Sequence, residues 1–435
     1  QQQQQQPFMH INRPQMMHSV PMQPPPNRQS PIPPNLRGPN GPNGQPLRRP
    51  VIRRTIVLDP KNHKRVCHFD VTSNYQITKL LGRGSFGLVV EAYDTIRKCK
   101  VAIKKIENLS KQKPAELKRV LREVLVQKHL SKAGGHPNIC PLLDLVIPVS
   151  YDQFNDMYLI MEALDKDFTC VTSSNKALND PTCQYMLYQM LRGLKYMHSG
   201  DIVHRDLKPS NVLINGSLHI KICDFGLSRG MTHDEIMSTT YVVTRQYRAP
   251  ELLLDWKGCD QKVDIWSVGC IFAEMLFFDP KRSPPRRVLF PGRTHLQQIE
   301  IITDQIGTPP PSDVKGSIDG IEHMGRISKK MKQPWDNILP MVHNKDAIHL
   351  LDWMLQYDPN KRCSAEDALA HPYFEQLRKS NAIDNLEPIC PERFTIRIPE
   401  NPDFKKLLYN EIIELNVRNG FGGEPIVDPN VITVK

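Results

Sequence analysis

The sequence predicts an α+β protein in which a small β-rich lobe is followed by a larger, mainly α-helical lobe. Short β-rich runs between residue 75 and about residue 162 surround a single helical stretch, PAELKRVLREVLVQKHL. After residue 165 the pattern changes to helices in which apolar residues recur at three- and four-residue spacing. A layout of this kind limits the fold but is weak support for a function, so the motifs must decide.

The individual elements follow in order along the chain. The predicted strands of the first lobe are YQITKLLG, FGLVVEAYD, KVAIKKI and MYLIME. The predicted helices of the second lobe are PTCQYMLYQMLRGLKYMHSG, QKVDIWSVGCIFAEMLF, HLQQIEIITDQIG and DAIHLLDWMLQY. We expect one domain over residues 75–374, with a first lobe of about 75–164 and a second of about 165–374.

A Gln/Pro-rich basic tail precedes this domain. It holds 13 prolines in its first 50 positions and few large aliphatic residues, so it buries too little apolar surface to offset the entropy lost on ordering. Residues 1–55 are therefore predicted to be disordered. Residues 375–435 are expected to form an extension that wraps back on the domain.

Charge and composition exclude several classes of protein. Seven of the 11 net positive charges come from arginines in residues 1–54, so the domain itself is only mildly basic and nucleic-acid binding is not expected. The ten cysteines show no paired spacing, which favours reduced thiols over disulfides or zinc. No apolar run approaches the roughly 18 to 20 residues of a membrane span, so no membrane association is expected.

A glycine-rich segment is the first motif that suggests chemistry. It fits G-x-G-x-x-G-x-V, in which glycines let a turn between two strands approach phosphate groups closely. A dinucleotide-binding motif shares this spacing but continues into a helix, whereas VVEAYD continues as a strand. The predicted ATP-binding residues here are Leu81, Gly82, Arg83, Gly84, Ser85, Phe86, Gly87, Leu88 and Val89.

Lys104, in the run VAIK that follows, is the expected cation for the α- and β-phosphates of ATP. Glu123, on the helical stretch of the first lobe, is its natural ion-pair partner. Each residue alone has an ordinary surface interpretation. Together with the glycine-rich segment they favour a nucleotide site.

The strongest signal is VHRDLKPSN followed by ICDFG. Asp206 is placed to accept the proton of an attacking hydroxyl, and Lys208 can stabilise the transferring phosphoryl group. Asn211 and Asp224 supply hard oxygen ligands for Mg²⁺. Phosphoryl transfer needs positioning and charge neutralisation more than covalent chemistry, so this set predicts an ATP- and Mg²⁺-dependent kinase.

The activation segment carries a more specific resemblance. The run TTYVVTRQYRAPE resembles the Thr-x-Tyr lip of the mitogen-activated protein kinases, and so do VDIWSVGC, LFPG, IGTP and ALAHPYF, over about residues 65–420. The resemblance implies a bilobal protein kinase fold with this family's insert in the large lobe. The DLKP run resembles serine/threonine kinases, so the acceptor is expected to be Ser or Thr. Thr240 departs from the best-known lips, which leaves the subfamily and the activator open.

The resemblance further implies dual phosphorylation of Thr239 and Tyr241. Phosphothreonine would gather three arginines from separate elements, and phosphotyrosine would meet two more, forming a surface that favours proline after the acceptor. These phosphate-gathering residues are Arg122, Arg205, Arg229, Arg245 and Arg248.

Three other regions are assigned through the resemblance. The hinge should run from Met161 to Leu164, where backbone groups of Glu162 and Leu164 would bind adenine and Met161 would limit the pocket behind it. Glu251 is expected to pair with Arg362 as part of the scaffold. The acidic docking patch of the family is reduced here to Asp384 and Glu387, and a basic insertion occupies residues 281–287.

Expected partners are an upstream dual-specificity MAP kinase kinase, substrates with Ser-Pro or Thr-Pro sites, and phosphatases, with the kinase itself a monomer in cytoplasm and nucleus. Three alternatives stay open. A catalytically inactive scaffold is disfavoured because the catalytic residues are intact. A nucleic-acid-binding protein lacks interleaved aromatic residues, and a cyclin-dependent relative would lack Tyr241.

Overall fold

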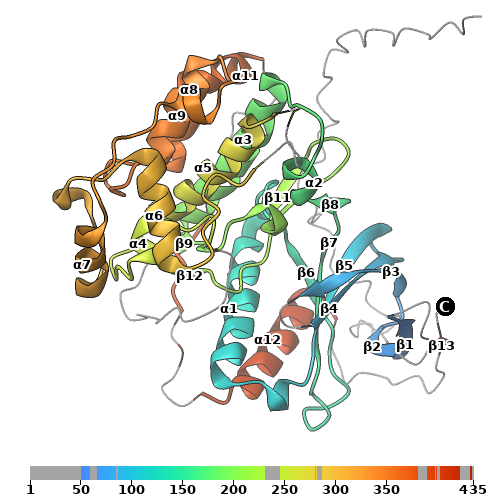
Figure 1. The fold of residues 1–435 in the computed structure, drawn as a ribbon. Coiled ribbons are helices and arrows are strands. Elements are labelled where there is room, and N and C mark those ends of the chain that lie inside the picture. Colours follow the sequence, from blue (N-terminus) through green and yellow to red (C-terminus); the bar gives the residue numbers. More distant parts are fainter. Residues whose placement is uncertain are drawn as a thin grey trace, which may run out of the picture.

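The computed structural model describes two lobes joined by a short connection (Figure 1). The described residues are 50–58, 66–84, 87–230, 245–279, 281, 287–380, 389–396, 398, 402–421 and 432–433. Among them, no helix is both long enough and apolar enough to cross a membrane. The predicted α+β, two-lobed architecture is confirmed.

The first lobe is built on an antiparallel five-stranded sheet with the order β3-β4-β5-β7-β6. Its strands are β3 (Tyr75–Gly84), β4 (Gly87–Asp94), β5 (Cys99–Ile106), β6 (Leu142–Leu145) and β7 (Met157–Glu162). The four predicted strands are all present, whereas β6 was not predicted because LLDL is buried throughout and shows no alternation.

Helix α1 (Pro114–Leu130) covers one face of this sheet and coincides with the predicted helical stretch. Proline in its first turn suits a helix start because the missing N–H group would have no partner there. Its buried residues Val120 and Val124 join an apolar cluster that also contains Ile106 of β5. The helix is therefore fixed directly against the strand that carries Lys104.

A hairpin of β1 (Val51–Val57) and β2 (Val66–Thr72) lies on the other side of the sheet from α1 (Figure 1). A short strand β13 (Ile432–Thr433) pairs in parallel with β1. The predicted disordered tail was placed too far along the chain, since its last five residues belong to β1. The two arginines of VIRRTIV obscured the strand pattern, but Val51, Phe69 and Val71 are buried in an apolar cluster that the hairpin shares with the sheet.

The second lobe is helical and its core surrounds α3 and α5. Its helices are α2 (Thr169–Thr172), α3 (Asp180–Ser199), α4 (Pro250–Leu253), α5 (Lys262–Leu276), α6 (His295–Ile306), α7 (Ile318–Arg326), α8 (Trp335–Ile338), α9 (Lys345–Met354), α10 (Ala365–Ala370) and α11 (Glu375–Lys379). The four predicted helices correspond to α3, α5, α6 and α9. Short 3-10 helices lie at Leu109–Lys111, Lys132–Gly134, Pro209–Asn211, Pro311–Asp313 and Pro372–Phe374.

Helix boundaries follow local chemistry. Asn179 caps α3 by accepting a hydrogen bond from the Thr182 amide, and Thr294 caps α6 by accepting one from Gln297. Helix α6 stops at Gly307, whose φ of 86° suits glycine.

Small strands frame the loops between the lobes. These are β8 (Lys166–Asp167), β9 (Ile202–Val203), β10 (Val212–Ile214), β11 (Ile220–Ile222) and β12 (Arg229–Gly230). Strand β10 pairs with both β8 and β11, and β12 pairs with β9. This pairing holds the HRDLKPSN and DFG segments side by side.

The described part of the C-terminal extension returns to the first lobe as α12 (Phe404–Arg418), beside α1 (Figure 1). Leu408 and Ile412 are fully buried in the apolar cluster of α1. Lys128 of α1 forms ion pairs with Glu411 and Glu414 of α12. The extension thus packs against α1 through both apolar contacts and ion pairs.

Candidate active site

Lys104 and Glu123 form an ion pair between β5 and α1. The distance from Lys104 Nζ to Glu123 Oε1 is 2.6 Å, and Asp224 Oδ1 lies 3.7 Å from the same nitrogen. Burial alone would lower the pKa of Lys104, but the two carboxylates outweigh it and raise that pKa. The lysine is therefore held as a cation.

The HRDLKPSN segment is shaped by Asp264, a fully buried residue of α5. Its carboxylate accepts hydrogen bonds from the backbone amides of His204 and Arg205, both at 2.8 Å, and from His198 Nε2 at 3.0 Å. Burial would raise the pKa of Asp264, but these donors hold it below its ordinary value.

Arg205 needs this support because its φ is 68°, in the left-handed region that non-glycine residues rarely adopt. In the sequence, Asp264 appears only as part of the VDIWSVGC motif, from which no role was predicted for it. The available signal was a carboxylate in the first turn of a mainly apolar helix, since a buried charge requires partners.

Asp206 lies within a tight set of polar contacts. Lys208 Nζ is 3.0 Å from Asp206 Oδ2, and Asn211 Nδ2 donates to the Asp206 carbonyl at 2.8 Å and to Oδ2 at 3.1 Å. Burial raises the pKa of Asp206, and the Lys208 cation opposes that rise. The three predicted residues are thus brought together around one carboxylate.

Asp224 follows β11 and adopts a φ of 65°. Burial would raise its pKa, but the neighbouring Lys104, His204 and Lys208 hold it below the ordinary value. Phe225 is fully buried against the His204 ring, with the ring centroids 5.5 Å apart. This packing leaves the Asp224 side chain 42% exposed and facing the same space as Lys104.

The glycine-rich segment forms the turn between β3 and β4, in which Gly84 pairs with Gly87. Ser85 and Phe86 lie outside the described residues. A Cβ atom on Gly87 would lie 2.0 Å from the Lys105 carbonyl oxygen, and the φ of Gly87 is 154°. Glycine is therefore required where this turn meets β5. Of the flanking residues, Leu81 is 42% exposed, whereas Leu88 is buried.

The predicted hinge continues from the end of β7. Met161 and Glu162 are its last two residues, and Leu164 follows before β8. Met161 Sδ accepts a hydrogen bond from Gln127 of α1 at 3.4 Å. The Glu162 carbonyl accepts one from Cys140 Sγ at 3.7 Å, a contact that the sequence did not indicate.

Arg122, Arg205 and Arg229 meet although they belong to different elements. Arg229 of β12 pairs with Val203 of β9, which brings it beside the loop that carries Arg205. Burial, together with the positive charges of nearby arginines, lowers the pKa of Arg122 to about 10 and that of Arg229 to about 9. Arg119 contributes to both shifts and was not predicted from the sequence.

Some of the remaining predicted residues belong to the described structure and others do not. Thr239 and Tyr241 lie outside the described residues, as do Asp384 and Glu387 and most of the 281–287 insertion. Arg245 Nη1 donates to the Arg293 carbonyl at 3.5 Å, and Arg248 Nη1 lies 3.5 Å from His295 Nε2. Glu251 and Arg362 form the expected buried ion pair, with 2.7 Å between Oε1 and Nη1.

Comparison with known proteins identifies the family. A family model described as Protein kinase domain matches residues 75–374. Mitogen-activated protein kinase 3 of Arabidopsis thaliana is 40% identical over 359 residues, which are 81% of this chain and 92% of the relative. Extracellular signal-regulated kinase 1 of Dictyostelium discoideum is 41% identical over 357 residues, 79% of this chain and 63% of the relative.

Mitogen-activated protein kinase 5 of Oryza sativa subsp. indica is 41% identical over 356 residues, which are 80% of this chain and 91% of the relative. These matches agree with the resemblance carried by the activation segment and the DLKP run. The chain therefore belongs to the mitogen-activated protein kinase family, as an ATP-using protein kinase of the serine/threonine type.

Proposed function

We propose that this kinase transfers the γ-phosphoryl group of ATP to Ser-Pro and Thr-Pro sites after phosphorylation of its own Thr239 and Tyr241. The observation that carries this proposal is the complete catalytic set: the Lys104–Glu123 ion pair is formed while Asp206, Lys208 and Asn211 are in contact. Such a set belongs to an active kinase rather than to an inactive scaffold.

Asp206 is the proposed base that orients the acceptor hydroxyl and takes its proton. Its raised pKa suits this role because a more basic carboxylate is a better proton acceptor, provided that it stays ionised at neutral pH. Lys208 and Lys104 act as fixed cations toward the transferring group and the α- and β-phosphates.

Asn211 and Asp224 fit a magnesium site. Asp224 stays ionised because nearby cations lower its pKa, and Asn211 uses Nδ2 as a donor to Asp206, which leaves Oδ1 as its acceptor atom. Mg²⁺ takes one or two oxygen ligands from protein and the rest from phosphates and water, and when bound it neutralises phosphate charge.

Phosphothreonine 239 is proposed to bind Arg122, Arg205 and Arg229. Each of these arginines adjoins a catalytic element: Arg122 precedes Glu123, Arg205 precedes Asp206, and Arg229 follows the DFG segment. A dianion at this point relieves the repulsion between the guanidinium groups and holds the three elements together. Arg245 and Arg248 are proposed to meet phosphotyrosine 241.

The partners that follow are an upstream dual-specificity kinase, phosphatases that reverse the lip phosphorylation, and Ser/Thr-Pro substrates. We further propose that the kinase acts as a monomer in both cytoplasm and nucleus. Size-exclusion chromatography with light scattering tests the first of these two statements, and imaging of the tagged full chain tests the second.

The test is transfer of labelled γ-phosphate from Mg·ATP to a Thr-Pro peptide and to a matched Thr-Ala peptide. Lip-phosphorylated protein, unphosphorylated protein and the Asp206→Ala variant are compared, with EDTA present in one arm. The expected result is a rate that rises by orders of magnitude on phosphorylation, prefers Thr-Pro, and is lost with Asp206→Ala or EDTA. Phosphorylated protein that binds Mg·ATP but transfers nothing would instead support a scaffold.

A further inference from the structure

Lys104 and Lys105 are consecutive residues of β5, so their side chains leave opposite faces of the sheet. Lys104 points to α1 and pairs with Glu123. Lys105 points to the β1–β2 hairpin and is almost fully buried, with a side chain only 7% exposed. Its role is not explained by the phosphoryl-transfer site.

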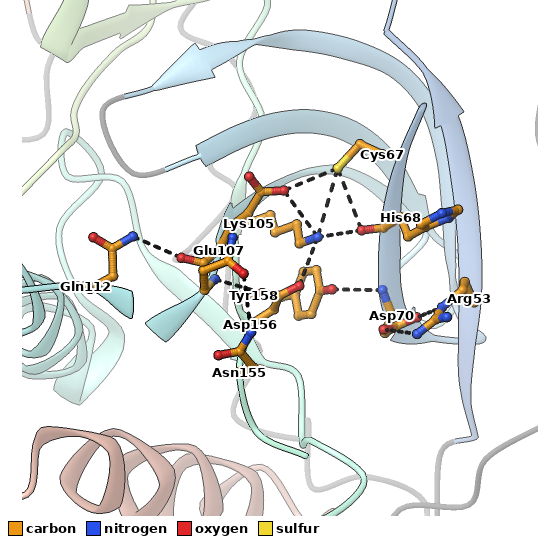
Figure 2. Close-up of polar contacts among 11 residues, drawn as sticks. Arg53, Cys67, His68, Asp70, Lys105, Glu107, Gln112, Asn155, Asp156 and Tyr158 are labelled. Atoms are coloured by element: carbon orange, nitrogen blue, oxygen red, sulfur yellow. Dashed lines mark hydrogen bonds and ion pairs between the residues drawn. The ribbon is translucent and has the colours of Figure 1, made fainter. Parts of the chain in front are cut away.

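Figure 2 shows that Lys105 is the centre of a polar network behind the sheet. Its Nζ donates to the His68 carbonyl of β2 at 2.7 Å, and it lies 2.9 Å from Asp156 Oδ2 and 3.3 Å from Glu107 Oε1. The ammonium group also lies 5.7 Å from the centre of the Phe69 ring. A single cation thus joins the hairpin to two carboxylates from different segments.

The neighbours of Lys105 complete this network. Cys67 Sγ donates to Glu107 Oε1 at 3.4 Å, and burial raises the pKa of the Cys67 thiol to about 11, so it stays a donor. Tyr158, opposite Lys105 on β7, accepts a hydrogen bond from the Asp70 amide of β2 at 3.0 Å. The hairpin is therefore attached to both β5 and β7.

This network adjoins the glycine-rich turn. A Cβ atom on Gly87 would lie 2.0 Å from the Lys105 carbonyl oxygen and 3.7 Å from Glu107 Cγ, so the end of the turn rests directly on this part of β5. Asp156 also accepts a hydrogen bond from the Asn108 amide at 3.0 Å. The segment from Lys105 to Asn108 is thereby held by the side chains of Lys105 and Glu107 and by the Asn108 amide.

We propose that Lys105 is a positioning residue for ATP binding. It holds the β1–β2 hairpin, Glu107 and Asp156 around one ammonium group. It thereby fixes the β5 backbone against which Gly87 packs and which carries the Lys104 side chain. This inference rests on the proposed nucleotide site. Without the Lys105 cation, Glu107 and Asp156 become two like charges facing one partly buried point, and their segments move apart.

The experiment compares full-length Lys105→Met with the wild type in three measurements: the Kd of Mg·ATP by calorimetry, the melting temperature without ligand, and KM and kcat for ATP. Val71→Ala is the matched control, because Val71 is fully buried on the same hairpin but brings no polar atom to the network. The Kd is measured without any transfer, so a wild type that binds ATP but transfers nothing contradicts the proposed function and still tests Lys105.

We expect Lys105→Met to weaken ATP binding by roughly tenfold and to raise KM by the same factor, while kcat at saturating ATP stays within about threefold. Val71→Ala should lower the melting temperature but leave the Kd unchanged. The proposal is overturned if Lys105→Met binds ATP as tightly as the wild type, or if Val71→Ala weakens binding equally at the same loss of melting temperature.

A second variant keeps the proposal testable should Lys105→Met fail to fold. Asp156→Asn removes one of the two carboxylates from Lys105 at a side chain that is 29% exposed, so we expect the fold to be retained. We expect a smaller weakening of ATP binding, by about threefold. An unchanged Kd in this variant also overturns the proposal.

Discussion

The catalytic centre and the arginine cluster differ in how their charges are balanced. In the catalytic centre each lysine faces a carboxylate: Lys104 lies 2.6 Å from Glu123, and Lys208 lies 3.0 Å from Asp206. In the cluster, burial and the charges of nearby arginines lower the pKa of Arg122 to about 10 and that of Arg229 to about 9.

This difference indicates how the charge of each region is balanced. Opposite charges at short distance stabilise the catalytic centre within the chain itself, whereas like charges in a partly buried space favour an external dianion. The lip phosphate is the proposed dianion. In this proposal the catalytic residues and the residues that bind the lip phosphate are separate sets, although three of the arginines adjoin catalytic segments in the sequence.

The largest expected effect comes from breaking the balance of the catalytic centre. Lys104→Met leaves Glu123 and Asp224 as two carboxylates with no shared cation, and removes the cation for the phosphates. Initial rates with saturating Mg·ATP should fall by about two orders of magnitude or more in both lip states. Lys100→Met, on the same strand but 62% exposed, is the control and should keep the wild-type rate.

A smaller effect is expected when the arginine cluster loses one member. Arg122→Met should lower the ratio of the phosphorylated rate to the unphosphorylated rate by about tenfold, because one charge-assisted contact to the proposed phosphothreonine is lost. The ratio is measured on samples whose lip occupancy is quantified by mass spectrometry. An unchanged ratio would separate this cluster from the lip.

The pH dependence of kcat tests the effect of Lys208 on Asp206. Burial raises the pKa of Asp206 above its ordinary value and the Lys208 cation lowers it, so Lys208→Met should raise that pKa further. Because the base must be deprotonated, activity is lost as the pH falls through this pKa. The acid limb of the kcat profile should therefore move to higher pH in Lys208→Met. A limb that stays in place, or moves to lower pH, would show that it does not report Asp206.

The smallest effect is expected at Arg119. It lies one turn before Arg122 on α1 and adds to the positive field at Arg122 and Arg229 without being the largest contributor. Arg119→Gln should lower the phosphorylated-to-unphosphorylated ratio by about twofold to threefold, less than Arg122→Met does. A loss equal to that of Arg122→Met would make Arg119 a direct phosphate ligand.

Much of the site was predictable because its chemistry depends on residue order. The spacing of Asp206, Lys208 and Asn211 within one loop makes their contact a local matter, and Lys104 followed by Glu123 on a helix is a recognisable pair. Asp264 was missed because its task is to hold the backbone of Arg205 from a helix about 60 residues later. Arg119 was missed because no motif includes it.

The sequence by itself determined the two-lobed α+β fold and the kinase family, and it supplied the residues that we propose for phosphoryl transfer, since periodicity and motifs are local properties of the chain. Only the tertiary structure decided which charges meet. It folded Val51–Val57 into a strand, buried Lys105 behind β5 between the hairpin and two carboxylates, and gathered arginines from α1, the catalytic loop and β12. Burial and like-charge proximity arise from packing between distant segments, so no single stretch of sequence encodes them.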